Sequence, residues 1–139
     1  MKKIILLGLT VFLVLAVTIS CKKKKDGGNN DRCGETEIKV ITIPANGTVD
    51  PPSPASTSFP LVVNLEATPV SGVTITVSAK AETGNSTPYF TETRENVTGS
   101  NKFQITSTPA GTSCIVDITV TSKTCNTNQW KGSYRYSTK

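Results

Sequence analysis

The sequence predicts an all-β domain, a single antiparallel β-sandwich of about six to seven strands. Apolar and polar side chains alternate in six short segments after residue 36, and period-two alternation is typical of half-buried strands. Gly, Pro and Asn lie between these segments, which is where turns are expected. Thr, Ser and Val are abundant, Leu is scarce, and no strong helical periodicity is present, which also favours β structure.

The first three predicted strands lie in the N-terminal half of the body. Residues 37–43 alternate and end before Pro44, and residues 59–67 place Phe59, Leu61, Val63, Leu65 and Ala67 on one face. After a turn at 68–72, residues 73–79 alternate aliphatic side chains with Thr and Ser. Each segment therefore has one face suited to a core and one suited to solvent.

Three more strands are predicted towards the C-terminus. They are centred on 103–105, 114–121 and 130–136. Two connections are long, 45–58 and 81–101, and the second is expected to contain one weak strand near Tyr89-Phe90-Thr91. Loops of this length in a small domain are either functional or disordered.

Positive charge is concentrated near the N-terminus. Of the 15 basic residues, six are Lys2, Lys3 and Lys22 to Lys25, so the body from Asp26 onward carries 9 basic and 10 acidic residues. This distribution argues against nucleic-acid binding, which requires a basic folded surface. The chain has no His, which excludes His-based catalysis and His-ligated metals. The sequence therefore predicts no enzyme, no catalytic residue, no metal and no cofactor.

Residues 1–20 have the pattern of a cleaved signal peptide. Lys2 and Lys3 precede an apolar run from Ile4 to Ile19. As a helix this run would span about 24 Å at ~1.5 Å per residue, less than the ~30 Å hydrocarbon core of a bilayer. The short run and the small residue Ser20 fit a leader that is removed after export.

Thr18-Ile19-Ser20-Cys21 resembles the lipobox of bacterial lipoproteins. Ser20 and Cys21 match the pattern, Ile19 is tolerated, and Thr18 stands where the family most often has Leu. The resemblance implies cleavage after Ser20, a diacylglycerol thioether on the Cys21 thiol and an acyl group such as palmitate on the freed amine. Each buried CH₂ contributes ~0.8 kcal/mol, so two or three chains hold a protein on a membrane.

Residues 21–34 are predicted to be the lipidated Cys and a flexible tether rich in Lys, Gly and Asn. The run of four lysines ending in Asp26 resembles the export signals of surface lipoproteins. That resemblance implies an outer-membrane protein with exposure at the cell surface. The same lysines would also fit an uncleaved transmembrane anchor, because positive charge after an apolar run tends to stay on the cytoplasmic side.

The alternation over residues 35–139 resembles immunoglobulin-like or fibronectin-III-like sandwiches of bacterial surface proteins. The paired Cys and mid-strand Trp of antibody domains are missing, since Trp130 lies near the C-terminus. In an immunoglobulin-like sandwich the first strand can run parallel to the last, so that the starts of both strands lie together. Cys33 and Cys125 precede those two strands, and the resemblance therefore implies a Cys33–Cys125 disulfide.

The third cysteine of the body, Cys114, is predicted to be a buried thiol. Cys114 and Cys125 bracket a strand, and its residues 114–121 alone span about 23 Å at ~3.3 Å per residue. A disulfide requires Cα atoms within ~7 Å, so that pairing is disfavoured. Cys114 also shares a face with Val116, Ile118 and Val120, which points into the core.

Aromatic side chains are the candidate ligand contacts. Trp130, Tyr134 and Tyr136 share one face of the last predicted strand. They fit either a binding platform or, as we favour, burial in the core. Tyr89 and Phe90 lie in the second long connection and are the better candidates for exposed contact.

Two functional hypotheses follow from the sequence. The first is a lipid-anchored, non-catalytic binding or adhesion module with a protein or glycan ligand. The second is a structural or accessory subunit of an envelope complex that assembles through sheet edges, which accept or donate strands.

Overall fold

Seven β-strands make up the computed structural model, which describes residues 32–50, 58–84 and 87–138. No helix occurs in these ranges. The predicted all-β fold class is therefore confirmed. The strands are β1 (Lys39–Ile43), β2 (Phe59–Ala67), β3 (Val73–Ala81), β4 (Phe90–Glu95), β5 (Ser100–Ile105), β6 (Ser113–Ser122) and β7 (Gln129–Ser137).

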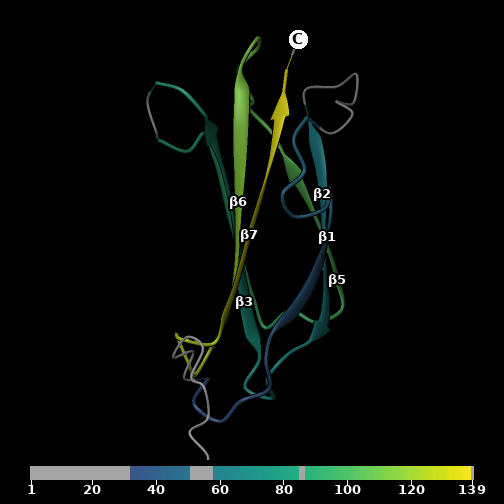
Figure 1. The fold of residues 1–139 in the computed structure, drawn as a ribbon, viewed down its shortest axis with the longest axis vertical. Coiled ribbons are helices and arrows are strands. Elements are labelled where there is room, and N and C mark those ends of the chain that lie inside the picture. The colour runs from purple at the N-terminus through teal and green to yellow at the C-terminus, as the bar shows by residue number, and fades with distance from the viewer. Residues whose placement is uncertain (1–31, 51–57, 85–86, 139) are drawn as a thin grey trace, which may run out of the picture.

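The strands form two antiparallel sheets that pack against each other as a β-sandwich (Figure 1). The three-stranded sheet has the order β1-β2-β5, and the four-stranded sheet has the order β4-β3-β6-β7. In constant-type immunoglobulin domains the fourth strand joins the sheet of the first, second and fifth. Here β4 instead pairs with β3, from Ala79 opposite Phe90 to Thr74 opposite Glu95.

One core lies between the two sheets, because alternate residues of the strands point inward. On β6 the side chains of Cys114, Val116, Ile118 and Val120 are buried and alternate with half-buried ones. Burying an aliphatic side chain contributes about 1.5–3 kcal/mol relative to leaving it exposed. Other fully buried aliphatic and aromatic side chains are Leu61, Val63, Val73, Ile75, Val77, Phe103 and Ile105.

Strand β4 is longer than the weak strand that the sequence predicted near residues 89–91. Its inward positions after Phe90 are Glu92 and Arg94, so the strand lacks the aliphatic pattern that identifies a strand from sequence. The Arg94 guanidinium lies 4.2 Å from the centroid of the Phe103 ring on β5 and bonds Glu92 at 2.7 Å. A cation over an aromatic ring thus replaces an aliphatic contact at this margin of the core.

The chain after β1 crosses from one sheet to the other. Gly47 donates its N–H to the Ser133 carbonyl at 2.7 Å, and Arg135 donates to the Thr48 carbonyl at 2.9 Å. Residue numbers rise together along both segments, so this stretch runs parallel to β7. The expected first strand, β1, pairs with β2 in the other sheet, so the stretch that runs parallel to β7 is the segment after β1 and not β1 itself.

The two ends of the sandwich differ (Figure 1). The proximal end carries Cys33 and the short connections β2–β3, β4–β5 and β6–β7. The distal end carries residue 138 and the three longest connections, which are β1–β2, β3–β4 and β5–β6. Antiparallel pairing places alternate connections at opposite ends, so the start of the domain and its longest connections are separated by the length of the strands.

Candidate functional site

A disulfide closes the proximal end of the domain. Cys33 and Cys125 are bonded, with their Cα atoms 6.0 Å apart, and the Thr127 hydroxyl lies 3.1 Å from the Cys125 sulfur. Cys33 precedes β1 and Cys125 lies in the β6–β7 connection, as predicted. Residues 32–34, which the sequence analysis assigned to the tether, are thereby attached to the folded domain. Cys114 is a buried free thiol, which confirms the prediction made for it.

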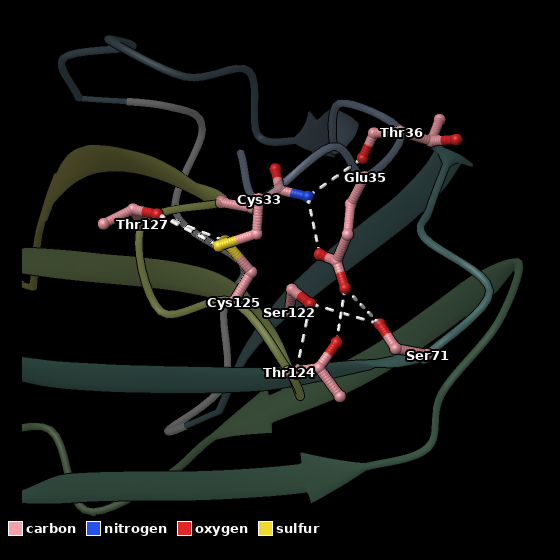
Figure 2. Close-up of a disulfide and its surroundings, with 9 residues drawn as sticks. Cys33, Glu35, Thr36, Ser71, Ser122, Thr124, Cys125 and Thr127 are labelled. Atoms are coloured by element: carbon pink, nitrogen blue, oxygen red, sulfur yellow. Dashed lines mark hydrogen bonds between the residues drawn. A yellow bond between two sulfur atoms is a disulfide. The ribbon is translucent and has the colours of Figure 1, made fainter. Parts of the chain in front are cut away.

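The Glu35 carboxylate sits beside this disulfide and gathers donors from two connections (Figure 2). The Ser71 hydroxyl of the β2–β3 connection donates at 2.9 Å, and the Thr124 hydroxyl also donates. The Asn128 side-chain amide donates to the carboxylate at 3.1 Å and to the Thr36 carbonyl at 2.9 Å. The Glu35 carboxylate therefore links the segment before β1 to both the β2–β3 connection and the β6–β7 connection.

These hydrogen bonds stabilise the ionised form of Glu35. Those from Ser122 and Thr124 contribute most, those from Asn128 and Ser71 contribute less, and partial desolvation acts in the opposite direction. Together they lower the pKa of Glu35 from 4.5 to about 2, as expected for a carboxylate that accepts several hydrogen bonds. We refer to the Cys33–Cys125 disulfide and the Glu35 hydrogen bonds as the proximal latch.

At the distal end the last residues of β7 contact all three long connections. Arg135 donates its backbone N–H to the Thr48 carbonyl in the first connection, and its guanidinium donates to the Glu82 carboxylate in the second. The Ser137 hydroxyl donates to Asp50 at 2.8 Å.

The third long connection is held by the residue after β7. Thr138 donates its N–H to the Thr112 carbonyl at 3.1 Å and its hydroxyl to the Pro109 carbonyl at 2.7 Å. We call Arg135, Ser137 and Thr138 the distal hub. Loops that a rigid scaffold positions in this way are common places for binding residues.

A tyrosine pair also underlies the distal end. The hydroxyls of Tyr89 and Tyr136 are 2.7 Å apart, and the Thr108 hydroxyl lies 2.7 Å from that of Tyr136. The pKa of each tyrosine is raised, mainly because burial removes its hydroxyl from water. Both hydroxyls therefore remain protonated and serve as hydrogen-bonding groups. Cys114 donates its thiol to the Thr112 carbonyl at 3.5 Å in the same region.

The candidate ligand contacts do not form one surface. Tyr89 and Phe90 are half-buried against the core near the distal end, and the Tyr89 hydroxyl is bonded to Tyr136. Trp130 is also half-buried but lies at the start of β7, opposite Val120. Tyr134 and Tyr136 are buried, so the aromatic face of β7 is part of the core, as favoured from the sequence.

The hydrogen bonds of the proximal latch and those of the distal hub were not predicted from the sequence. Glu35 carries no motif, because its donors come from segments that only the fold brings together. The described residues hold no group of three His, Cys, Asp or Glu side chains able to bind a metal. Across those same residues, no helix has the length and apolarity to cross a membrane. Cys21, Ser20 and the rest of the leader lie outside the described residues.

No known protein family, no curated protein and no solved structure matches this chain.

Proposed function

We propose that this chain is a lipoprotein of the bacterial envelope whose β-sandwich is a non-catalytic binding or adhesion module. In this proposal residues 1–20 are removed on export, and lipid on Cys21 anchors the protein at the outer membrane, facing the cell surface. The pattern Thr18-Ile19-Ser20-Cys21 behind an apolar run supports the anchor. The ligand is a protein or a glycan.

The distal hub is the observation that carries the binding function. Three connections that are far apart in sequence are bonded to Arg135, Ser137 and Thr138 at one end of the sandwich. The segment that leads to Cys21 enters at the opposite end, where the proximal latch holds it. A protein anchored through that segment would present its longest connections away from the membrane.

Two exposed valines at opposite ends provide a matched test of this arrangement. Val49 lies in the first long connection and is 61% exposed, whereas Val70 lies in the short β2–β3 connection and is fully exposed. Aspartate at either position adds one charge without disturbing the core. The full-length chain, extracted from membranes in detergent, is first screened on glycan and peptide arrays.

Binding that Val49→Asp weakens and Val70→Asp leaves unchanged would support the proposal. Binding that responds only to Val70→Asp would move the ligand site to the proximal end and contradict the role of the distal hub. The absence of binding to any glycan or peptide at high micromolar concentration would count against a binding module.

A structural observation also favours a second function, an accessory subunit that assembles through sheet edges. Ile41 and Ile43 on the edge strand β1 are 49% and 59% exposed. Large apolar side chains on an edge strand are uncommon, because they promote pairing with other chains. Co-purification of a stoichiometric envelope partner after crosslinking in intact cells would favour this second function over ligand binding.

A further inference from the structure

The four edge strands of the sandwich are not equally protected. Strands β4 and β7 border the four-stranded sheet, and β1 and β5 border the three-stranded sheet. Native proteins protect edges with charges or by covering them with other segments.

Three of these edges carry such protection. On β4 the inward-facing side chains of Glu92 and Arg94 carry charge and form an ion pair, and the exposed Glu95 follows them. The edge of β7 is covered, because Gly47 and Thr48 already form backbone hydrogen bonds with this strand. On β5 the outward side chains are polar and include the exposed Lys102.

Strand β1 is the exception among the described strands. Its outward positions are Lys39, Ile41 and Ile43, and both isoleucines are about half exposed. Ile43 lies opposite Val62 on β2, so an apolar strip runs from the edge into the outer face of the sheet. No described strand pairs with the other side of β1.

We propose that β1 is a self-association edge, on which the β1 strand of a second copy pairs antiparallel. In the register centred on Ile41, Ile41 faces Ile41 of the second copy and Lys39 faces its Ile43. The contact between the two Ile41 side chains would stabilise the paired strands, and no like charges face each other in this register. The two copies share one twofold axis, as expected for an isologous dimer.

The charges around the strip favour a second copy over a charged partner or a lipid surface. Lys39, Lys102 and Glu66 occupy exposed positions on the outer face of this sheet, and together they give it a net charge of only +1. The pairing is short, because β1 ends before Pro44, which lacks an N–H. Anchoring on a membrane would raise the effective concentration of such a short edge. This last step alone rests on the proposed function.

Cysteine trapping tests the register directly. In the full-length Cys21→Ser chain the remaining native cysteines are the Cys33–Cys125 disulfide and the buried Cys114. Ile41→Cys in that background adds one exposed thiol. Paired β1 strands would place the two Cβ atoms about 5 Å apart, so mild oxidation is expected to give disulfide-linked dimer with Ile41→Cys and little or none with a Lys102→Cys control on β5.

A second variant shows whether the dimer depends on the strip. Adding Ile43→Lys to Ile41→Cys should abolish the crosslink. In the proposed register, Lys39 of each copy would then face the new lysine at position 43 of the other copy, and like charges directly opposite each other destabilise strand pairing. Dimer formation by Ile41→Cys alone supports the proposal. Equal crosslinking of Ile41→Cys and Lys102→Cys, or no crosslinking by either at rising protein concentration, would overturn it. Because the background lacks Cys21, this result does not depend on whether the natural chain is lipidated.

Discussion

Cys33 and Cys125 are 92 residues apart in sequence and are joined at the proximal end of the sandwich. The bridge connects the segment before β1, in one sheet, to the β6–β7 connection, in the other. A pull transmitted through the tether therefore reaches both sheets. This covalent link is the strongest part of the proximal latch.

Reduction of this disulfide should lower stability substantially. A cross-link that closes a loop of about a hundred residues restricts the unfolded chain, and removing a native disulfide from a small exported domain costs roughly 2–5 kcal/mol. Urea unfolding with and without reductant measures the difference. In the Cys33→Ser/Cys125→Ser variant, reductant should have no further effect. An unchanged midpoint for the reduced wild type would contradict the prediction.

Glu35 should make stability depend on pH in the acid range. Its folded pKa of about 2 lies below the ordinary value of 4.5. The carboxylate therefore contributes stability that is fully present above pH 4.5 and is lost as the pH falls from 4.5 through 2. We expect Glu35→Gln to be less stable than the wild type at pH 7, and the difference in unfolding free energy to narrow over that window.

Glu37→Gln is the matched control for Glu35. Glu37 forms an exposed ion pair with Arg32, and such surface pairs contribute little to stability. The effect of Glu37→Gln on the unfolding free energy should therefore be small. A Glu35→Gln difference that stays constant from pH 7 to pH 2 would contradict the assigned role of Glu35.

Gly132 should not tolerate a side chain. A Cβ at this position would lie 2.3 Å from an atom of the Trp130 ring and 2.9 Å from the Asn46 side chain. Gly132→Ala must therefore displace Trp130, and overpacking of this kind costs about 1–3 kcal/mol. Because the chain has one Trp, its fluorescence reports the displacement directly. Lys131→Ala, on the exposed face beside it, should change neither the spectrum nor the unfolding midpoint.

Thr42 offers a stabilising substitution. Its side chain is 4% exposed, and its hydroxyl finds no hydrogen-bond partner among the described residues. A buried polar group without a partner is destabilising, so Thr42→Val should raise the unfolding free energy by about 1 kcal/mol. Thr93→Val is the control, because its hydroxyl is exposed and lies 3.2 Å from that of Thr76. A destabilised Thr42→Val variant would show that this hydroxyl is needed.

Strand positions were predictable where apolar and polar residues alternate. The buried side of β6, from Cys114 to Val120, follows from the sequence alone. Strand β4 was underestimated because Arg94 fills a core-facing position that is usually aliphatic. The Cys33–Cys125 bridge was predictable through the resemblance to immunoglobulin-like sandwiches, which implies that the starts of the first and last strands lie together.

The hydrogen-bonded sites were not predictable, because they depend on side chains from separate connections. Glu35 meets Ser71 and Asn128 only after both sheets have formed. Ser137 and Asp50 are likewise brought together by the crossing of the chain from β1 to β7. Neither pair has a spacing or a motif that reports its proximity.

The intact mass of the protein extracted from bacterial membranes tests the central proposal, which is anchoring through Cys21. The wild type is compared with Cys21→Ser. The proposal predicts loss of residues 1–20 together with a mass gain of acyl size in the wild type, and neither change in the variant. An unmodified full-length mass in both proteins would contradict it, and the apolar run from Ile4 to Ile19 would then be an uncleaved membrane anchor.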